Sequence, residues 1–137
     1  MKLKLFTLTI LMVAVFLAGC GNGVSLEDTE WVLESYGQQG NLETVLADTE
    51  VTATFKSADK QVAGSGGCNG YSGSYELSGN KLSIPWPLMS TMMSCGDAKD
   101  RQEQQFFKSL QSAESYKIDD GKLTINCGDN ILVFSQK

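Results

Sequence analysis

The chain has 137 residues, of which 42% are hydrophobic, and its 11 basic and 16 acidic side chains give a formal net charge of −5. This length suits one compact domain, because two cores of half the size would each be only marginally stable. The sequence contains no histidine, which excludes imidazole bases, Ser-His-Asp triads and histidine-containing zinc sites. The acidic balance argues against nucleic acid as a partner, since nucleic-acid affinity comes largely from basic surfaces.

The first twenty residues are organised like a secretory signal. Lys2 and Lys4 precede an apolar run over residues 5–17, which is shorter than the roughly 20 apolar residues of a membrane span. The run ends in Leu-Ala-Gly-Cys at residues 17–20, which resembles the lipobox of bacterial lipoproteins. That resemblance implies that Cys20 is lipidated on sulfur and becomes the acylated N-terminus, with palmitate among its acyl chains.

The expected domain organisation follows from this lipobox. We expect residues 1–19 to be a cleaved lipoprotein signal peptide, residues 20–27 to form a lipid anchor and flexible tether, and residues 28–137 to fold as one domain. Gly21, rather than aspartate, follows the lipidated cysteine and resembles the outer-membrane sorting signal of bacteria with two membranes. We therefore expect a cell-envelope protein, on the periplasmic side of the outer membrane in such a host.

The membrane contact of the mature protein should be made by the lipid alone. Each buried CH2 group of an acyl chain contributes about 0.8 kcal/mol to membrane binding. The mature chain keeps nine basic and 16 acidic side chains, and this net charge of −7 would be repelled by anionic headgroups. We expect a monomeric domain that stands off the surface.

Alternation of apolar and polar residues predicts short antiparallel strands along the mature chain. The period of two is clearest in residues 51–55 and 71–77, as in half-buried strands. Clusters of Gly, Asn, Asp and Ser between the periodic segments predict hairpin turns. The expected strands lie at residues 29–36, 51–55, 71–77, 81–84, 88–93, 114–118, 122–127 and 131–134. Residues 37–48 show no sustained period and are expected to form a long loop, or a loop with a small element around residues 42–46.

One segment has the period of a helix instead. Residues 98–113 place Phe106, Phe107 and Leu110 at helical spacing among charged and polar side chains, which predicts an amphipathic helix. Asp100 followed by Glu103 fits a variant of the N-terminal capping box. The fold class is therefore mainly β (α+β), with a curved antiparallel sheet or partly open β-barrel and one amphipathic helix packed on it.

Residues 64–75 read GSGGCNGYSGSY, a glycine-rich block that suits bent and closely approaching strands. Its pattern G-x-x-G-C-N-x-Y-x-G-x-Y resembles the META domain, also called the HslJ-like family, of bacterial envelope proteins. Residues 29–33 (TEWVL) resemble the opening T-x-W-x-L block of that family. Residues 91–95 (TMMSC) resemble its T-[KR]-M-[AS]-C block, with Met92 in place of the usual cation. The residues that carry the family motifs are Gly67, Cys68, Asn69, Tyr71, Gly73, Tyr75, Thr91, Met93 and Cys95.

The resemblance extends over about residues 29–134 and implies heat-inducible expression, altered drug tolerance and no active site. With Cys20 lipidated, three cysteines remain in a compartment where disulfides persist. Cys68 and Cys95 lie in the two strongest family blocks beside turn-rich segments, whereas Cys127 shares the inward parity of the apolar residues before it. We predict a Cys68–Cys95 disulfide and a buried Cys127 thiol.

No metal or other cofactor is expected. Three methionines and Cys95 fall within seven positions at residues 89–95, and such ligands suit Cu(I). Met89 and Met93 share one strand face while Met92 falls on the other, and methionine is a common core residue. Ser-x-x-Lys pairs at residues 57–60 and 78–81 lack the supporting motifs of penicillin-binding proteins. We therefore expect no enzymatic activity.

The sequence favours a non-catalytic, lipid-anchored envelope module that acts by binding or by supporting the envelope under stress. Two alternatives stay open. One is a small-ligand carrier that uses a pocket of the curved sheet, and the other is an interaction module that engages a protease or another envelope protein through residues 37–48. A deep apolar pocket would favour the carrier. A filled interior with an exposed apolar patch near residues 37–48 would favour a protein partner.

Overall fold

The computed structural model describes residues 23–85 and 87–137. The predicted signal peptide and Cys20 lie outside the described residues. The elements, in chain order, are β1 (Glu30–Gln38), β2 (Asn41–Thr44), β3 (Thr52–Lys56), β4 (Gln61–Ser65), β5 (Gly70–Ser74), β6 (Glu76–Ser78), β7 (Lys81–Ser83), β8 (Met89–Ser90), α1 (Asp97–Gln111), β9 (Ser115–Asp119), β10 (Lys122–Cys127) and β11 (Asn130–Gln136).

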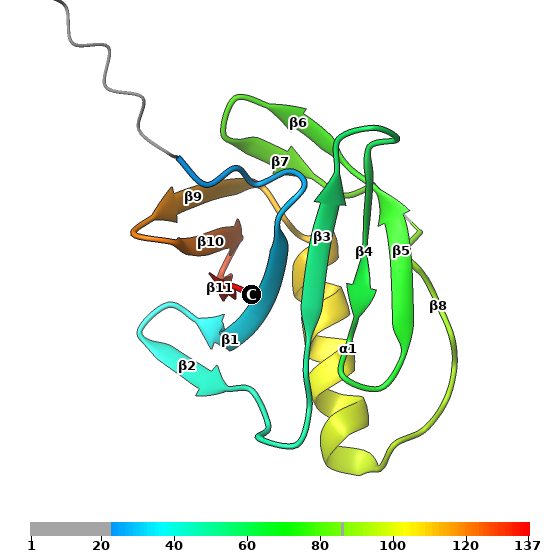
Figure 1. The fold of residues 1–137 in the computed structure, drawn as a ribbon. Coiled ribbons are helices and arrows are strands. Elements are labelled where there is room, and N and C mark those ends of the chain that lie inside the picture. The colour runs from blue at the N-terminus through cyan, green and yellow to red at the C-terminus, as the bar shows by residue number, and fades with distance from the viewer. Residues whose placement is uncertain (1–22, 86) are drawn as a thin grey trace, which may run out of the picture.

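The strands form one curled antiparallel sheet in the order β6-β7-β9-β10-β11-β1-β3-β4-β5-β8, with β2 paired to β1 beside this path. The sheet bends into a half-barrel, and α1 is the single helix of the described chain (Figure 1). The predicted fold class, a curved antiparallel sheet with one packed helix, is confirmed. The turn clusters predicted from the sequence, at residues 78–80, 120–121 and 128–130, connect β6 to β7, β9 to β10 and β10 to β11.

One bent segment serves both ends of this sheet. β6 is the first strand in this order, and β5 pairs with the last strand, β8. Only Tyr75 separates β5 from β6 in the chain. The backbone N–H of Tyr75 donates to the carbonyl of Lys60, 2.9 Å away. The chain thus leaves one end of the sheet at Ser74 and enters the other end at Glu76, which brings the two ends together.

Helix α1 fills the space inside the half-barrel, where it lies behind β3 and β4 in Figure 1. Its side chains Phe106 and Leu110 are fully buried. The ring of Phe106 lies 5.6 Å from that of Tyr71 on β5 and 6.4 Å from that of Phe134 on β11, measured between centroids. The helix therefore joins the two sides of the sheet through aromatic contacts. The described residues include no helix with the length and hydropathy of a membrane-spanning segment.

Near the start of the described chain, Val24 packs against the core and Leu26 is buried in it. The carbonyl of Leu26 accepts a hydrogen bond from the indole Nε1–H of Trp31 at 3.1 Å. Trp31 and Leu33 point into the core from β1, as their alternation predicts. The predicted inward parity of Cys127 is also confirmed, because its thiol is free and buried.

Of the two alternatives predicted for residues 37–48, the structure has the loop with a small element, which is the strand β2 at Asn41–Thr44. β1 extends to Gln38, and β2 pairs back onto it from Gln38↔Asn41 to Ser35↔Thr44. Gly40 in the turn has a φ of 89°, a conformation that glycine adopts at little cost. All four residues of β2 are exposed, so the strand has no apolar face and no period that sequence reasoning could detect.

Three points about the predicted strands need correction. The single strand predicted for residues 71–77 is two strands, β5 and β6, because the chain bends at Tyr75 and passes from one end of the sheet to the other. β4 was not predicted, because Gly64 and Ser65 interrupt its alternation. The strand predicted for residues 88–93 is reduced to Met89–Ser90, because the backbone after Ser90 makes hydrogen bonds to the Asn69 side chain instead of a longer ladder with β5.

Candidate functional site

Three segments far apart in the sequence meet at the first two turns of α1. They are the β4–β5 loop with Gly67, Cys68 and Asn69, the connection that precedes the helix, and the helix itself. Cys68 and Cys95 form the predicted disulfide across the first two segments, with their Cα atoms 5.9 Å apart. Gly67 has a φ of 104°, so it turns the loop in a way that a residue with a side chain would resist.

Asn69 is buried at the centre of this meeting point. Its Nδ2 donates to Oε1 of Glu103 at 2.5 Å and to the carbonyl of Met93 at 3.0 Å. Its Oδ1 accepts from the Thr91 hydroxyl at 2.9 Å and from the Met93 backbone N–H at 2.7 Å. The amide of one side chain therefore fixes the position of the segment before α1.

Glu103 is buried under the same loop and holds it to the helix. Its Oε2 accepts hydrogen bonds from the backbone N–H groups of Cys68, at 3.1 Å, and of Asn69, at 2.6 Å. The carboxylate of Glu103 can approach the loop because residue 66 is a glycine. A Cβ on Gly66 would lie 2.6 Å from Oε2. We call the hydrogen bonds of Asn69 and Glu103 together the Asn69 network.

Asp100 lies one turn earlier on α1 and binds the segment that carries Cys95. Its carboxylate accepts from the Ser94 hydroxyl at 2.6 Å and from the Cys95 backbone N–H at 2.8 Å. These two hydrogen bonds lower the pKa of Asp100, with the Ser94 hydroxyl as the larger cause. The predicted capping box is therefore wrong, because Gly96 is the N-cap and Asp100 and Glu103 bind other segments instead of capping the helix.

The other motif residues lie along β5 and just beyond it, and they build the core. The Tyr71 hydroxyl donates to the carbonyl of Thr52 at 2.9 Å, and burial raises the pKa of this phenol. A Cβ on Gly73 would lie 2.6 Å from the side chain of Leu88, so the absent side chain makes room for the segment before β8. Tyr75 donates to Glu27 and packs edge-on against Phe55.

Sequence reasoning missed one more polar contact of the helix. Gln102 is buried, accepts from the backbone N–H of Leu46 at 2.8 Å and donates to the Thr49 hydroxyl at 2.9 Å. A glutamine on the polar side of a helical pattern carries no signal of burial, so only the pairing of distant segments reveals it. No buried side-chain nitrogen or oxygen of the described residues lacks a hydrogen-bond partner.

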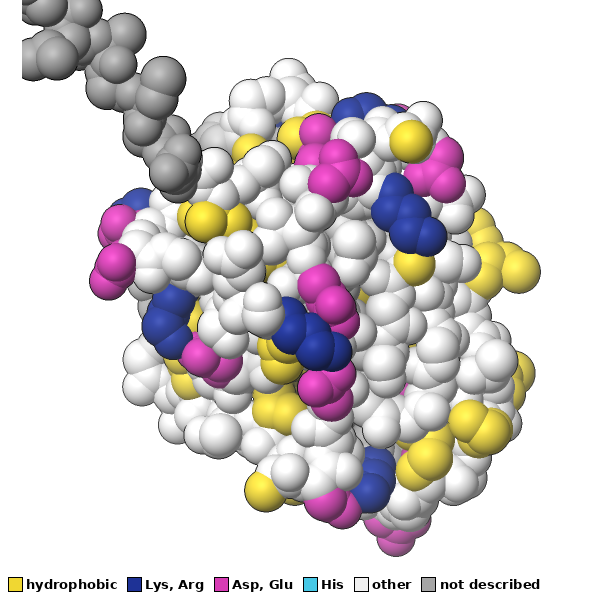
Figure 2. Space-filling model, viewed as in Figure 1, with side chains coloured by type: hydrophobic (Ala, Val, Ile, Leu, Met, Phe, Trp, Pro, Cys, Tyr) yellow, Lys and Arg dark blue, Asp and Glu magenta, His cyan; other side chains and the backbone are white. Residues whose placement is uncertain are grey.

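The expectation that the methionines fill the core is wrong. Met89, Met92 and Met93 are 67%, 96% and 61% exposed. We call residues 89–93 the methionine segment. Figure 2 shows hydrophobic side chains gathered along the edge of the molecule that carries β8 in Figure 1.

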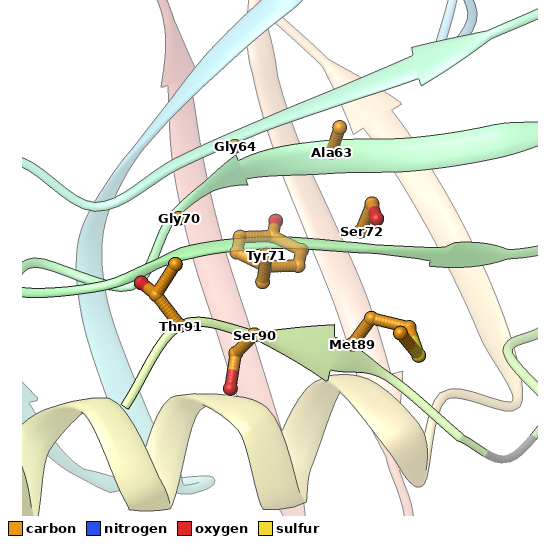
Figure 3. A pocket seen from close by; sticks show the side chains of 8 residues that line it. All are labelled: Ala63, Gly64, Gly70, Tyr71, Ser72, Met89, Ser90 and Thr91. Carbon is orange, nitrogen blue, oxygen red and sulfur yellow. The ribbon is translucent and has the colours of Figure 1, made fainter. Parts of the chain in front are cut away.

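A surface hollow of about 500 Å³ borders the methionine segment. Figure 3 shows that the side chains around it are small except for Tyr71 and Met89. Its lining consists of Ala63, Gly64, Gly70, Tyr71, Ser72, Met89, Ser90 and Thr91. The hollow is shallow and open to solvent, which distinguishes it from an enclosed ligand pocket.

The chain forms a small β-rich domain, in which one helix fills a half-barrel of antiparallel strands. A disulfide and the Asn69 network hold a glycine-rich loop at the start of that helix. The family model for the META domain matches residues 24–137. The chain therefore belongs to the META domain family, as its motifs predict. No functionally curated protein matches the sequence.

Solved structures of similar shape support the fold. An NMR structure of a protein from Burkholderia xenovorans superimposes with a TM-score of 0.70 at 25% identity, covering 82% of this chain and 83% of that one. A second NMR structure has a TM-score of 0.63 at 21% identity and covers 82% and 95% of the two chains. The crystal structure of a DUF4847 family protein from Bacteroides vulgatus has a TM-score of 0.57 at 15% identity, with coverage of 80% and 93%. The last two likenesses concern the fold alone.

Proposed function

We propose that the protein is a non-catalytic, lipid-anchored module of the cell envelope that binds another envelope protein through the methionine segment. The exposure of Met89, Met92 and Met93 is the observation that carries this proposal. Contiguous exposed apolar surface marks interaction sites, and methionine side chains adapt to varied partners. Residues 82–96 also contain no charged side chain, although 20% of the whole chain is charged.

The end of the methionine segment is held to the domain before any partner arrives. Asn69 binds both the N–H and the carbonyl of Met93, and the disulfide fixes Cys95 two residues later. A segment that is already ordered loses less entropy on binding. The hollow beside Met89 offers space for an apolar side chain of the partner.

The small-ligand carrier has less support than the protein-binding module. Trp31, Phe55, Phe106 and Phe134 are fully buried and fill the interior of the half-barrel. The hairpin of residues 37–48 also has less support as the docking surface. Its exposed large hydrophobic residue is Leu42, at 40%, whereas the methionine segment offers three such residues close together.

The lipid anchor and the location extend this proposal from the sequence. Cys20 in its lipobox supports attachment to a membrane, and Gly21 supports the periplasmic side of the outer membrane in a host with two membranes. The family resemblance adds an association with envelope stress and drug tolerance. In this arrangement the protein supports the envelope by holding a partner near the membrane.

The experiment is capture of the lipidated protein from its own membranes after cross-linking. Three forms are compared: the wild type, the triple variant Met89→Gln, Met92→Gln, Met93→Gln, and the control Leu42→Gln. We expect a partner protein that is enriched with the wild type and with the control but reduced about tenfold or more with the triple variant, because hot-spot side chains dominate binding. Equal recovery with the triple variant, or no enrichment over an unrelated lipoprotein, would contradict the proposal. Circular dichroism checks that all three forms fold.

A further inference from the structure

The disulfide and one carboxylate form a compact group of metal-binding atoms at the start of α1. The two sulfur atoms of Cys68 and Cys95 and one carboxylate oxygen of Asp100 all lie within 4.8 Å of one another. We propose that, once a dithiol has reduced the Cys68–Cys95 disulfide, these three residues bind one Zn²⁺ ion with water as the fourth ligand. This site departs from the sequence-based expectation that no metal binds, and it shares Cys95 and the Asn69 network with the end of the methionine segment.

Hydrogen bonds hold the two cysteine-bearing segments in addition to the disulfide. The backbone N–H of Cys68 is held by Glu103, and that of Cys95 by Asp100. Asn69 links the same two segments through Met93. We expect these hydrogen bonds to persist when the S–S bond opens and to keep the two thiols close together, and a preformed ligand set costs little ordering on metal binding.

The chemistry balances with a dithiol as the reductant. Two electrons and two protons pass from the dithiol to the disulfide, so that the S–S bond breaks, two thiols form and the reductant becomes a disulfide itself. Zn²⁺ then displaces one proton from each thiol, and two protons are released to solvent. Asp100 contributes one carboxylate oxygen, which lies within 4.8 Å of both sulfur atoms.

The ligand set suits zinc in geometry and in kind. Zinc accepts thiolate and carboxylate ligands in a tetrahedron, and Zn–S bonds of about 2.3 Å place two sulfur atoms about 3.8 Å apart. The Cα separation of 5.9 Å and the 4.8 Å limit on the ligand atoms allow this arrangement with small side-chain rotations. Cys95 is exposed, so both the reductant and the ion can reach the site.

Neighbouring groups favour these three ligands over the other sulfur atoms of the domain. Cys127 is buried, and burial raises the pKa of its thiol to about 12, so it stays protonated. Met92 is almost fully exposed. Among the acids around the site, Glu103 and Asp97 do not belong to the ligand group, although Asp97 in the first turn of α1 adds negative charge.

The test uses the full chain in detergent with Cys20→Ala and Cys127→Ala, so that Cys68 and Cys95 are the remaining cysteines. The protein is reduced with dithiothreitol, freed of reductant without air, and titrated with Zn²⁺ against a chromophoric chelator. We expect one tight Zn²⁺ per reduced chain and about 100-fold weaker binding to the oxidised chain. Co²⁺ should give the absorption of a tetrahedral thiolate site in the reduced chain.

Single substitutions assign the ligands. Cys68→Ser should weaken Zn²⁺ binding by about 100-fold and Asp100→Asn by about tenfold, whereas Asp97→Asn on the same helical turn should change it less than about twofold. The Co²⁺ spectrum should change with Asp100→Asn and not with Asp97→Asn. Equal binding by oxidised and reduced chains, equal effects of the two aspartate substitutions, or loss of circular-dichroism signal on reduction alone would each overturn the proposal.

Discussion

Asn69 shows how much of this structure depends on one short side chain. Its amide uses two donor hydrogens, toward Glu103 and Met93, and two acceptor lone pairs, toward Thr91 and Met93. An aspartate of the same length would lose both donors, and a serine would lose reach. The residue thereby fixes both the disulfide-bearing loop and the methionine segment that we propose as a binding surface.

Replacing Asn69 should be among the most destabilising polar substitutions in the domain. We expect Asn69→Ala to lower the free energy of unfolding by about 3 kcal/mol, because it leaves several buried groups without partners. Asn126 is exposed on β10 and has no side-chain hydrogen bond among the described contacts, so Asn126→Ala should cost less than about 0.5 kcal/mol. Urea denaturation measures both, and similar losses for the two variants would contradict the role of the Asn69 network.

Asp100 should make part of the stability depend on pH. Its pKa is lowered from 3.8 in the folded protein, so its carboxylate stabilises the fold above about pH 4, and this contribution is lost as the pH falls through the lowered value. Asp100→Asn should therefore be less stable than the wild type at pH 7, and the difference should shrink below pH 4. Urea denaturation at pH 7, 4 and 3 tests this, with Asp97→Asn as the control. A constant difference at all three pH values would show that the charge of Asp100 is irrelevant.

At the scale of elements, β3 and β4 can approach each other closely because Gly64 of β4 has no side chain. A Cβ on Gly64 of β4 would lie 2.1 Å from the carbonyl oxygen of Thr52 on β3. That carbonyl also accepts the hydroxyl of Tyr71 from β5. The packing of β3, β4 and β5 thus depends on Gly64, because a side chain at this position would keep the backbones of β3 and β4 apart.

Gly64→Ala should separate β3 from β4. We expect a loss of about 2–3 kcal/mol in unfolding free energy, because the obstructing atom belongs to the backbone and cannot rotate away. Gly70→Ala is the matched control, since its nearest obstruction is 3.9 Å away, and it should change the stability by less than about 1 kcal/mol. Thermal unfolding followed by circular dichroism compares the two. The explanation fails if both substitutions are tolerated equally.

The elements also show which features a sequence of this kind predicts. Strands β3 and β10 alternate strictly beside turn residues, and α1 carries Phe106 and Leu110 at helical spacing, so local patterns were sufficient. The disulfide followed from the family blocks together with parity. The capping box failed because Glu103 binds Asn69, 34 residues away, and no local pattern contains such a pairing. The exposure of the methionines was missed for a related reason, since the Asn69 network ends β8 after Ser90.

At the scale of the whole molecule, the start of the described chain and the proposed binding surface lie on different sides of the domain. In Figure 1 the described chain starts beside β6 and β9, and β8 lies at the opposite edge of the domain. A domain tethered through Cys20 would therefore hold its N-terminal side toward the membrane. The methionine segment would face the aqueous side, where a protein partner can reach it.

Cys20 should determine both processing and lipidation. We expect the wild-type protein purified from membranes to have the mass of residues 20–137 plus acyl chains, 118 residues in all. Cys20→Ala should retain residues 1–19 and incorporate no labelled palmitate, because lipidation precedes cleavage in the lipoprotein pathway that the lipobox indicates. Cys127→Ala is the control and should be processed normally. Mass spectrometry decides the matter, and an acylated Cys20→Ala chain would refute the anchor.

The bent segment from β5 to β6 has a consequence for self-association. An open sheet normally presents a long unpaired strand at each end, which can template aggregation with another copy. Here one segment supplies strands to both ends, and the outermost strands of the path are the three residues of β6 and the two of β8. The further edge strand β2, which pairs with β1 beside this path, has four residues. Edges this short give a second chain little to pair with. The curl of the sheet thus protects the protein against edge-to-edge polymerisation when many copies crowd one surface.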